Sequence, residues 1–400
     1  MVNFRAGYQP LVASAKHRDM QFRYDPIHSG DYSPVAGNLR AGHKREPSFS
    51  TNKDSAAKPN AGATGVIYVG SSDRKVYAID PVTGRAKWPK PFESEGWVFS
   101  SPAVAEGVVY VGSGDNNVYA IDAVTGQTKW PKPFATGGWV SSSPAVAEGV
   151  VYVGSGDNNF YAIDAVTGQT KWPKPFATTH EVWSSPAVVD GVVYVGSGSN
   201  LYAIDAESGR AKWPKPFATH YEMWPSPAVV DGVVYVGSGD GNVYAIDAES
   251  GRAKWPKPFK TKGMIVSSPA VAAGVVYIGG LDNNVYAIDA ESGRAKWPKP
   301  FKTEAWVGSS PAVINGVVYI GSSDGNFYGI NAATGRAEWP PFETSGWIVS
   351  SPAVLNDSVY FGSGDDFYAI DTVTGLPKWP KPFHVGAAVF SSPAVVADFA

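Results

Sequence analysis

The chain has 400 residues, a formal net charge of −3 and no cysteine. The lack of cysteine excludes disulfides, thiolate metal sites and thiol nucleophiles, and the small net charge gives no indication of nucleic-acid binding. No apolar run approaches the ~18 residues of a transmembrane helix, so we predict no membrane span.

Residues 1–64 are predicted to form a largely irregular arm. Basic residues outnumber acidic ones in it, and Ser, Asn, Lys, Ala, Gly and Pro dominate its second half. The segment Phe22–Gly30 contains aromatic side chains and an Asp-Pro turn signal, so we expect the arm to pack on the outside of the body. The N-terminus is a poor secretory leader. We therefore expect a cytoplasmic location, or an extracytoplasmic one if a leader has been removed.

From residue 65 onward, one phrase recurs eight times. In one copy it runs from Tyr119 to Trp130, and its tyrosine stands at positions 77, 119, 161, 202, 244, 286, 328 and 368. The step between copies is therefore close to 40 residues, and each repeat contains four strand-like runs. A period of this length predicts a β-propeller with one blade per repeat.

The copy that begins at Trp139 illustrates the four predicted strands. Trp139–Val146 is rich in small residues, which suits a crowded innermost strand, and Val150–Gly154 is a continuous apolar run typical of a strand buried on both faces. Phe160–Asp164 is the predicted third strand. Lys171–Phe176 contains two prolines, which predicts the outer edge of the blade because proline cannot donate to a neighbouring strand.

The two ends of the repeat region are predicted to pair. The body begins with a second strand, Gly65–Gly70, and ends with an inner strand, Val389–Val395. The C-terminal inner strand is therefore expected to complete the N-terminal blade and close the ring. The predicted fold is an all-β, eight-bladed propeller of four-stranded antiparallel blades spanning residues 65–400, and we expect a monomer.

The repeats share the pattern Ala-x-Asp-x-x-Thr-Gly-x-x-x-Trp, as in Ala120, Asp122, Thr125, Gly126 and Trp130, with Ser for Thr in three copies and Asn331 for Asp in one. This pattern resembles the tryptophan-docking motif of the PQQ-like propeller repeat family, over about residues 65–395. In that family each such tryptophan wedges between neighbouring blades. The resemblance implies the same role for Trp88, Trp130, Trp172, Trp213, Trp255, Trp297, Trp339 and Trp379.

The resemblance implies the fold and not the function, and our first hypothesis is a non-catalytic binding or scaffold module. Quinoprotein dehydrogenases are similar in fold but carry long insertions, a calcium site and commonly adjacent cysteines, whereas this chain has no cysteine and no insertion in the ring. We therefore predict no catalytic residue, no metal site and no cofactor. A PQQ-dependent dehydrogenase, with PQQ and calcium, is the distant alternative.

The repeats differ most just before the conserved Ser-Pro-Ala-Val segment. Five residues before its proline, four copies have tryptophan, but two neighbouring copies have Glu181 and Glu222 and carry their tryptophan two places later. His180 and His220 stand nearby. The candidate ligand-binding residues are thus Glu181, Glu222, His180, His220, Tyr221, Trp97, Trp139, Trp183, Trp224, Trp306 and Trp347.

These residues are predicted to surround the mouth of the central channel. Neighbouring carboxylates can bind a cation or share a proton, and tryptophans can stack on a sugar or another flat ligand. This pattern predicts a pocket for a small-molecule or carbohydrate ligand or a protein partner, in a binding protein or in an enzyme. The alternative is that the tryptophans fill the channel and the Glu and His side chains form a solvated rim.

Overall fold

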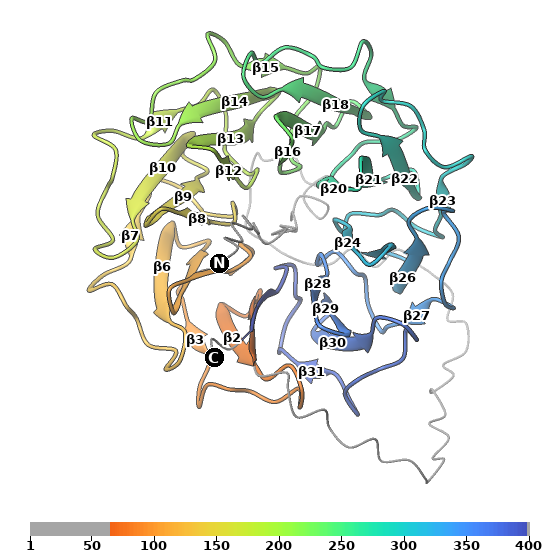
Figure 1. Cartoon of the computed structure of the whole chain (residues 1–400). Coiled ribbons are helices and arrows are strands. Elements are labelled where there is room, and N and C mark those ends of the chain that lie inside the picture. Colours follow the sequence, from red (N-terminus) through yellow and green to blue (C-terminus); the bar gives the residue numbers. More distant parts are fainter. Residues whose placement is uncertain (1–64, 398–400) are drawn as a thin grey trace, which may run out of the picture.

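The computed structural model describes residues 65–397, which form eight four-stranded antiparallel sheets arranged as blades around a central axis (Figure 1). These residues form strands and turns, and none of them belongs to a helix that could cross a membrane. The eight blades confirm the architecture predicted from the repeat. The predicted arm, residues 1–64, lies outside the described residues.

The strands fall into four sets, named from the axis outward. The inner strands are β4 (Ala103–Ala105), β8 (Ala145–Ala147), β12 (Ala187–Val189), β16 (Ala228–Val230), β20 (Ala270–Ala272), β24 (Ala312–Ile314), β28 (Ala353–Leu355) and β32 (Ala394–Ala397). The second strands are β1 (Gly65–Gly70), β5 (Val108–Gly112), β9 (Val150–Gly154), β13 (Val192–Ser197), β17 (Val233–Gly237), β21 (Val275–Gly280), β25 (Val317–Gly321) and β29 (Ser358–Ser363).

The third strands are β2 (Lys75–Ile79), β6 (Asn117–Asp122), β10 (Asn159–Asp164), β14 (Asn200–Asp205), β18 (Asn242–Asp247), β22 (Asn284–Asp289), β26 (Asn326–Asn331) and β30 (Asp366–Asp371). The outer strands are β3 (Phe92–Glu93), β7 (Phe134–Ala135), β11 (Phe176–Ala177), β15 (Phe217–Ala218), β19 (Phe259–Lys260), β23 (Phe301–Lys302), β27 (Phe342–Glu343) and β31 (Phe383–His384). Blade 1 consists of β32, β1, β2 and β3, and blades 2 to 8 follow in chain order.

The two ends of the described chain meet in blade 1. Strand β32 pairs antiparallel with β1, with Tyr68 opposite Ala394 and Gly65 opposite Ala397. This pairing confirms the predicted closure, in which the C-terminal inner strand completes the first blade.

The inner and outer strands differ from the prediction. In blade 3 the inner strand begins only after Pro144. Before it, serine hydroxyls take the place of strand pairing. Ser142 Oγ accepts from Gly154 N at 3.1 Å, and Ser143 N donates to Ser185 Oγ at 3.0 Å. The predicted run Trp139–Val146 is thus mostly loop, as is the predicted Val389–Val395. The outer strand is reduced to β11, because the two prolines before it bend the chain and only an isolated bridge forms at Thr170.

The hydrophobic core lies between the blades. Each core cluster joins second- and third-strand residues of one blade to those of the next, and each contains one of the eight repeat tryptophans, all buried. Trp130, for example, packs under the turn of blade 3 and donates from Nε1 to Ala165 O at 2.9 Å. The indoles therefore contribute apolar contact to every blade junction and, at seven of the eight, a hydrogen bond.

Close to the central axis, a ring of serines links each blade to the next. In each blade the backbone N–H of one buried serine donates to the hydroxyl oxygen of its counterpart in the next blade, at 2.9–3.0 Å. The series runs through Ser101, Ser143, Ser185, Ser226, Ser268, Ser310, Ser351 and Ser392, and Ser392 N returns to Ser101 Oγ.

Candidate functional site

One face of the propeller is built by two kinds of segment. The hairpin turns join second to third strands, and the inter-blade loops join the outer strand of one blade to the inner strand of the next. Direct hydrogen bonds hold the two together, as when Gly114 N donates to Trp97 O at 2.8 Å. All the predicted ligand-binding residues lie on inter-blade loops of this face rather than on the inner strands.

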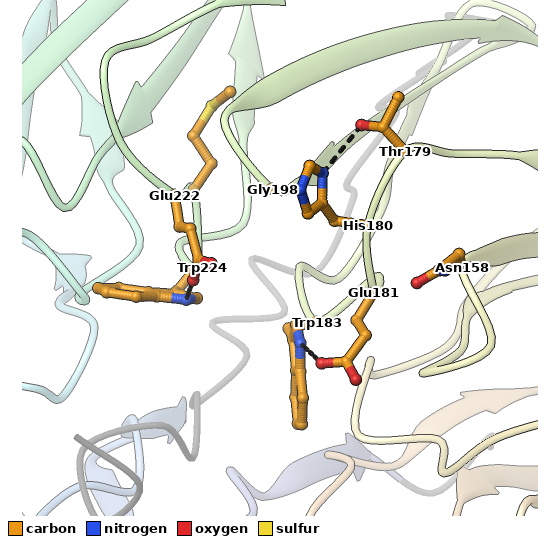
Figure 2. Close-up of a pocket in the computed structure, with 9 residues that line it drawn as sticks. Asn158, Thr179, His180, Glu181, Trp183, Gly198, Glu222 and Trp224 are labelled. Atoms are coloured by element: carbon orange, nitrogen blue, oxygen red, sulfur yellow. Dashed lines mark hydrogen bonds between the residues drawn. The ribbon is translucent and has the colours of Figure 1, made fainter. Parts of the chain in front are cut away.

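A pocket of about 270 Å³ opens on this face at blade 4 (Figure 2). It is called the blade 4 pocket here and is lined by Asn158, Thr179, His180, Glu181, Trp183, Gly198, Glu222, Met223 and Trp224. The structure thus brings together five of the predicted residues from the inter-blade loops that enter blades 4 and 5.

Two matched Trp–Glu pairs dominate the blade 4 pocket. Trp183 Nε1 donates to Glu181 Oε2 at 2.8 Å, and Trp224 Nε1 donates to Glu222 Oε2 at 2.7 Å. Each carboxylate turns toward the indole of its own loop (Figure 2). Trp183 is further held by Trp139, whose ring meets it edge-to-face at 4.9 Å. The shift of tryptophan by two places in these repeats therefore places an indole N–H within reach of the glutamate that replaced it.

His180 lies at the rim of the same pocket and is exposed. Its Nδ1 lies 3.1 Å from Thr179 Oγ1, and its backbone oxygen accepts from Ser197 Oγ at 2.6 Å. Gly198, with φ +53°, lets the ring approach, because a Cβ there would lie 2.6 Å from His180 Nδ1. The histidine ring of His180 therefore packs directly against the backbone of Gly198.

The remaining predicted residues lie outside the blade 4 pocket. His220 is exposed, and Tyr221 packs its ring edge-to-face on Trp224 at 6.0 Å. Trp97 packs on Phe99, and Trp306 packs on Trp347 with ring centroids 6.4 Å apart. The tryptophans of the inter-blade loops thus form local pairs around the mouth.

A second pocket, of about 520 Å³, opens at blade 8. This blade 8 pocket lies between the hairpin turns of blades 7 and 8 and the inter-blade loops that enter blades 8 and 1. Ser323, Asp324, Trp347 and Phe390 are among its lining residues. Sequence reasoning singled out Trp347 but missed the others.

The two pockets share a cause that was visible in the sequence. The hairpin turns of blades 4 and 8 are shorter than the others, with only residues 198–199 and 364–365 between the second and third strands, whereas residues 155–158 separate β9 from β10. The repeat steps that end at Tyr202 and Tyr368 are correspondingly short. A shorter turn occupies less space on this face, and these two blades lie four positions apart in the ring of eight.

The longer turns carry an aspartate that braces the rim. In blade 2, Asp115 Oδ2 accepts from Tyr119 OH at 2.7 Å and from Glu95 N at 2.9 Å, so the carboxylate ties the hairpin turn to the inter-blade loop. Burial and, secondly, the bond to Asp115 raise the pKa of Tyr119 above its ordinary value, so this phenol is a neutral donor. The blade 4 turn has no aspartate, and there Tyr202 OH pairs with Thr179 Oγ1 at 3.2 Å.

The repeats match a known protein family. A family model of the PQQ-like repeat, described as outer membrane protein assembly factor BamB, matches residues 40–226 and 222–384. The chain belongs to this PQQ-like propeller family. No curated protein sequence matches it.

Solved structures show the same fold at low sequence identity. A computationally designed protein named Ika8 has a TM-score of 0.65 and 17% identity, and the match covers 76% of this chain and 98% of that one. BamB from Moraxella catarrhalis has a TM-score of 0.63 and 20% identity, covering 76% and 89%. A europium-containing methanol dehydrogenase has a TM-score of 0.60 and 16% identity, covering 75% and 81%. At these identities the likeness shows the fold alone.

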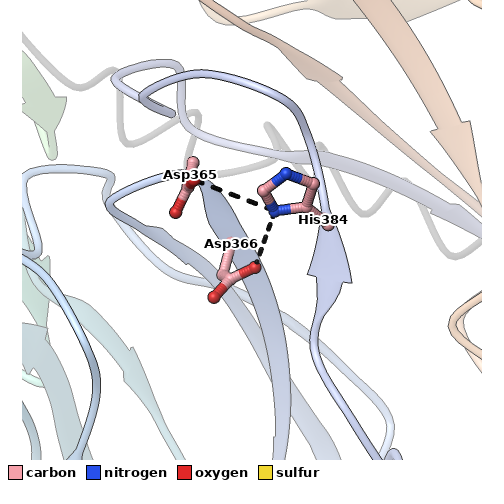
Figure 3. Close-up of side chains that lie close together, drawn as sticks. All are labelled: Asp365, Asp366 and His384. Carbon is pink, nitrogen blue, oxygen red and sulfur yellow. Dashed lines mark hydrogen bonds and ion pairs between the residues drawn. The ribbon is translucent and has the colours of Figure 1, made fainter.

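Three residues of types that can bind metals lie close together in blade 8. Among the described residues, Asp365, Asp366 and His384 bring their ligand atoms within 4.8 Å of one another at the outer part of blade 8 (Figure 3). His384 Nδ1 lies 3.3 Å from Asp366 Oδ1 and 3.8 Å from Asp365 Oδ2. Asp365 and His384 are exposed, and the contacts are those of a surface ion pair, so we assign no metal to them.

Proposed function

We propose that this PQQ-like propeller is a non-catalytic scaffold that binds a cationic side chain of a protein partner in the blade 4 pocket. The two Trp–Glu pairs carry this proposal. Indole faces attract guanidinium and ammonium groups, and carboxylates pair with the same groups. Trp183 is half-buried and can present a ring face to an arginine or lysine side chain, whereas Trp224 is buried and holds Glu222 through its hydrogen bond.

The pocket supports binding better than catalysis. A general acid or base must reach the proton of a bound substrate. Here Glu181 and Glu222 each accept a hydrogen bond from an indole N–H, a group that holds the carboxylate in place and does not ionise at ordinary pH. The carboxylates are therefore held in place as hydrogen-bond acceptors.

The residues that line the pockets do not fit PQQ, the alternative that the fold family implies. PQQ is a flat quinone that carries three carboxylates, and a site for it requires positive charge. The blade 4 pocket instead places two glutamates at its wall, and among the described residues no lysine or arginine lines either pocket. We therefore derive no reaction step through this cofactor.

A protein partner is supported by the family description. The matching family model is described as an assembly factor for outer membrane proteins, and an assembly factor acts by contact with other proteins. A rim that presents indoles and carboxylates suits such contact, because aromatic residues are enriched at the centres of protein interfaces.

Binding of small probes tests this proposal. N-acetyl-arginine amide, N-acetyl-lysine amide and neutral N-acetyl-glutamine amide are titrated while the indole N–H signals of Trp183 and Trp224 are followed by NMR. We expect the cationic probes to shift these signals and the Glu181→Gln/Glu222→Gln variant to weaken binding by about tenfold, the scale of one charged hydrogen bond.

Glu95→Gln/Glu304→Gln is the matched control. Both glutamates are exposed and lie on inter-blade loops of the same face, but in blades 2 and 7. This variant removes the same charge and is expected to bind as the parent does. Equal shifts with the neutral probe, or equal weakening by the two double variants, would contradict the proposal.

A further inference from the structure

We propose that the blade 8 pocket binds a neutral pyranose sugar, stacked on Trp347 and hydrogen-bonded by Ser323. This site is separate from the blade 4 pocket and does not depend on the scaffold role. At about 520 Å³ it lies within the ~300–1,000 Å³ range of small-molecule sites.

Trp347 supplies a stacking surface. Its side chain is 57% exposed, the most exposed of the tryptophans in the described residues, and Trp306 packs beside it at an angle of 60°. Val389 and Phe390 are buried in the same lining. A large exposed indole above an apolar floor is typical of a binding surface. A pyranose fits it, because one face of the ring presents C–H groups and its edge presents hydroxyls.

Ser323 supplies an unmet hydrogen bond. Its side chain is more than nine-tenths buried, and its hydroxyl has no partner among the described residues. Ser72 stands at the same position of its repeat, and there the hydroxyl donates to Ala388 O at 2.8 Å. A buried hydroxyl without a partner has lost its bonds to water and gained none in return, which is unfavourable. Rotation about χ1 would turn this buried oxygen toward the pocket, where a hydroxyl of the bound sugar would satisfy it.

The charge of the pocket favours a neutral ligand. Asp324 is the one charged residue in its described lining. Its carboxylate already accepts from Tyr328 OH at 2.8 Å, Glu304 N at 2.9 Å and Asn326 N at 2.8 Å. A carboxylate has about four acceptor sites, so at most one is left for a ligand. This leaves weak attraction for a cation and repulsion for an anion.

Ligand-observed NMR tests the proposal. Methyl α-glucoside, N-acetylglucosamine and maltose serve as probes, and saturation transfer from the protein reports binding. We expect transfer to at least one sugar, strongest at the C–H groups of one ring face. Trp347→Ala should weaken binding by about tenfold and Ser323→Ala by about threefold, the scales of an aromatic contact and of one neutral hydrogen bond.

Trp97→Ala is the matched control. Trp97 occupies the same repeat position as Trp347 and is 38% exposed, but it lines neither pocket. It should leave sugar binding unchanged, as should Glu181→Gln/Glu222→Gln, which separates this proposal from the scaffold role. Trp347→Phe, which keeps an aromatic ring, should retain part of the affinity and shows that the Trp347→Ala loss is not a folding defect.

Two outcomes would overturn the proposal. One is the lack of transfer to all three sugars with the folded parent protein. The other is an equal loss of binding in Trp97→Ala and Trp347→Ala, which would place the sugar elsewhere on the rim.

Discussion

Ser392 N donates a hydrogen bond to Ser101 Oγ at 2.9 Å, across 291 positions of the sequence. This bond completes the ring of serines, because each other member bonds to the next blade along the chain. Beside it, β32 completes blade 1 by pairing with β1. Two interactions therefore close the propeller in the same region: the pairing of β32 with β1, and the hydrogen bond from Ser392 to Ser101 near the axis.

Removing one hydroxyl from the serine ring should destabilise the fold. Ser101→Ala leaves the buried N–H of Ser392 without its acceptor, so we expect a loss of about 1–3 kcal/mol in the free energy of unfolding. Urea unfolding measures this loss. The control is Ser323→Ala, which removes a buried hydroxyl that has no partner and is expected to be neutral or slightly stabilising. Equal destabilisation by both would refute a bonding role for the ring.

The repeat tryptophans should be among the largest single contributors to stability. Trp297 is buried and donates from Nε1 to Ala332 O at 2.9 Å, so Trp297→Ala should cost about 3–5 kcal/mol. Trp297→Phe should cost less but still lose the hydrogen bond. Thermal and urea unfolding of both variants check this order, and a loss below about 1 kcal/mol for Trp297→Ala would be inconsistent with an inter-blade role.

Trp339 departs from the other repeat tryptophans, and Gly329 allows it. Seven of the eight indoles donate to a carbonyl of the next blade, whereas Trp339 Nε1 is buried and has no partner within residues 65–397. Its repeat lacks the lysine between the two prolines that follow, and Gly329 replaces the alanine of the other copies. A Cβ on Gly329 would lie 2.4 Å from Trp339 Cζ2.

Restoring the common residue at this position should therefore be harmful. We expect Gly329→Ala to destabilise the protein by about 1–3 kcal/mol through overpacking. This is the opposite of the usual effect, because alanine inside a strand is normally more stabilising than glycine. Ala287→Gly, the reverse change at the equivalent site of blade 6, provides the comparison and should cost about 0.5–1 kcal/mol. A stabilising Gly329→Ala would show that the indole has room to turn back to the common orientation.

The turn aspartates predict a loss of stability in acid. Asp164 Oδ1 accepts from Thr167 N at 2.8 Å and from Thr167 Oγ1 at 2.8 Å, and these bonds hold the pKa of Asp164 below its ordinary value. Since the folded pKa lies below the unfolded value of about 3.8, the stabilisation is complete above that pH and is lost as the pH falls through the folded pKa. The same holds for the corresponding aspartates Asp122, Asp205, Asp247 and Asp289.

Asp164→Asn isolates this effect in one blade. An asparagine can accept the same bonds without charge, as Asn331 does from Thr334 N at 2.9 Å in blade 7. We expect the variant to be less stable than the parent at pH 7 and to lose less stability between pH 5 and pH 2. Urea unfolding across this range measures it, and parallel pH profiles for the two proteins would contradict the assignment.

Much of the candidate site was predictable because the repeats are nearly identical. Where two copies exchange Trp for Glu, the sequence alone marks Glu181 and Glu222, and the structure places both in one pocket with His180, Trp183 and Trp224. The indole-to-carboxylate bonds were not predicted, since a spacing of two residues in a loop does not determine side-chain direction. Ser323 escaped notice because serine is common in these turns, and only its packing shows that its hydroxyl has no partner.

The amino-acid order by itself determined the number of blades, the second and third strands, the turn chemistry and the closure by the C-terminal strand. These features follow from the repeat period, the apolar runs and residues close together in the chain, such as Asp164 and Gly168. Only the tertiary structure decided where the pockets lie and how the inner and outer strands end. The pocket positions depend on the space between loops of neighbouring blades, and the ends of the inner strands depend on serine hydroxyls that replace strand pairing. Both involve contacts between residues about 40 positions apart in the sequence.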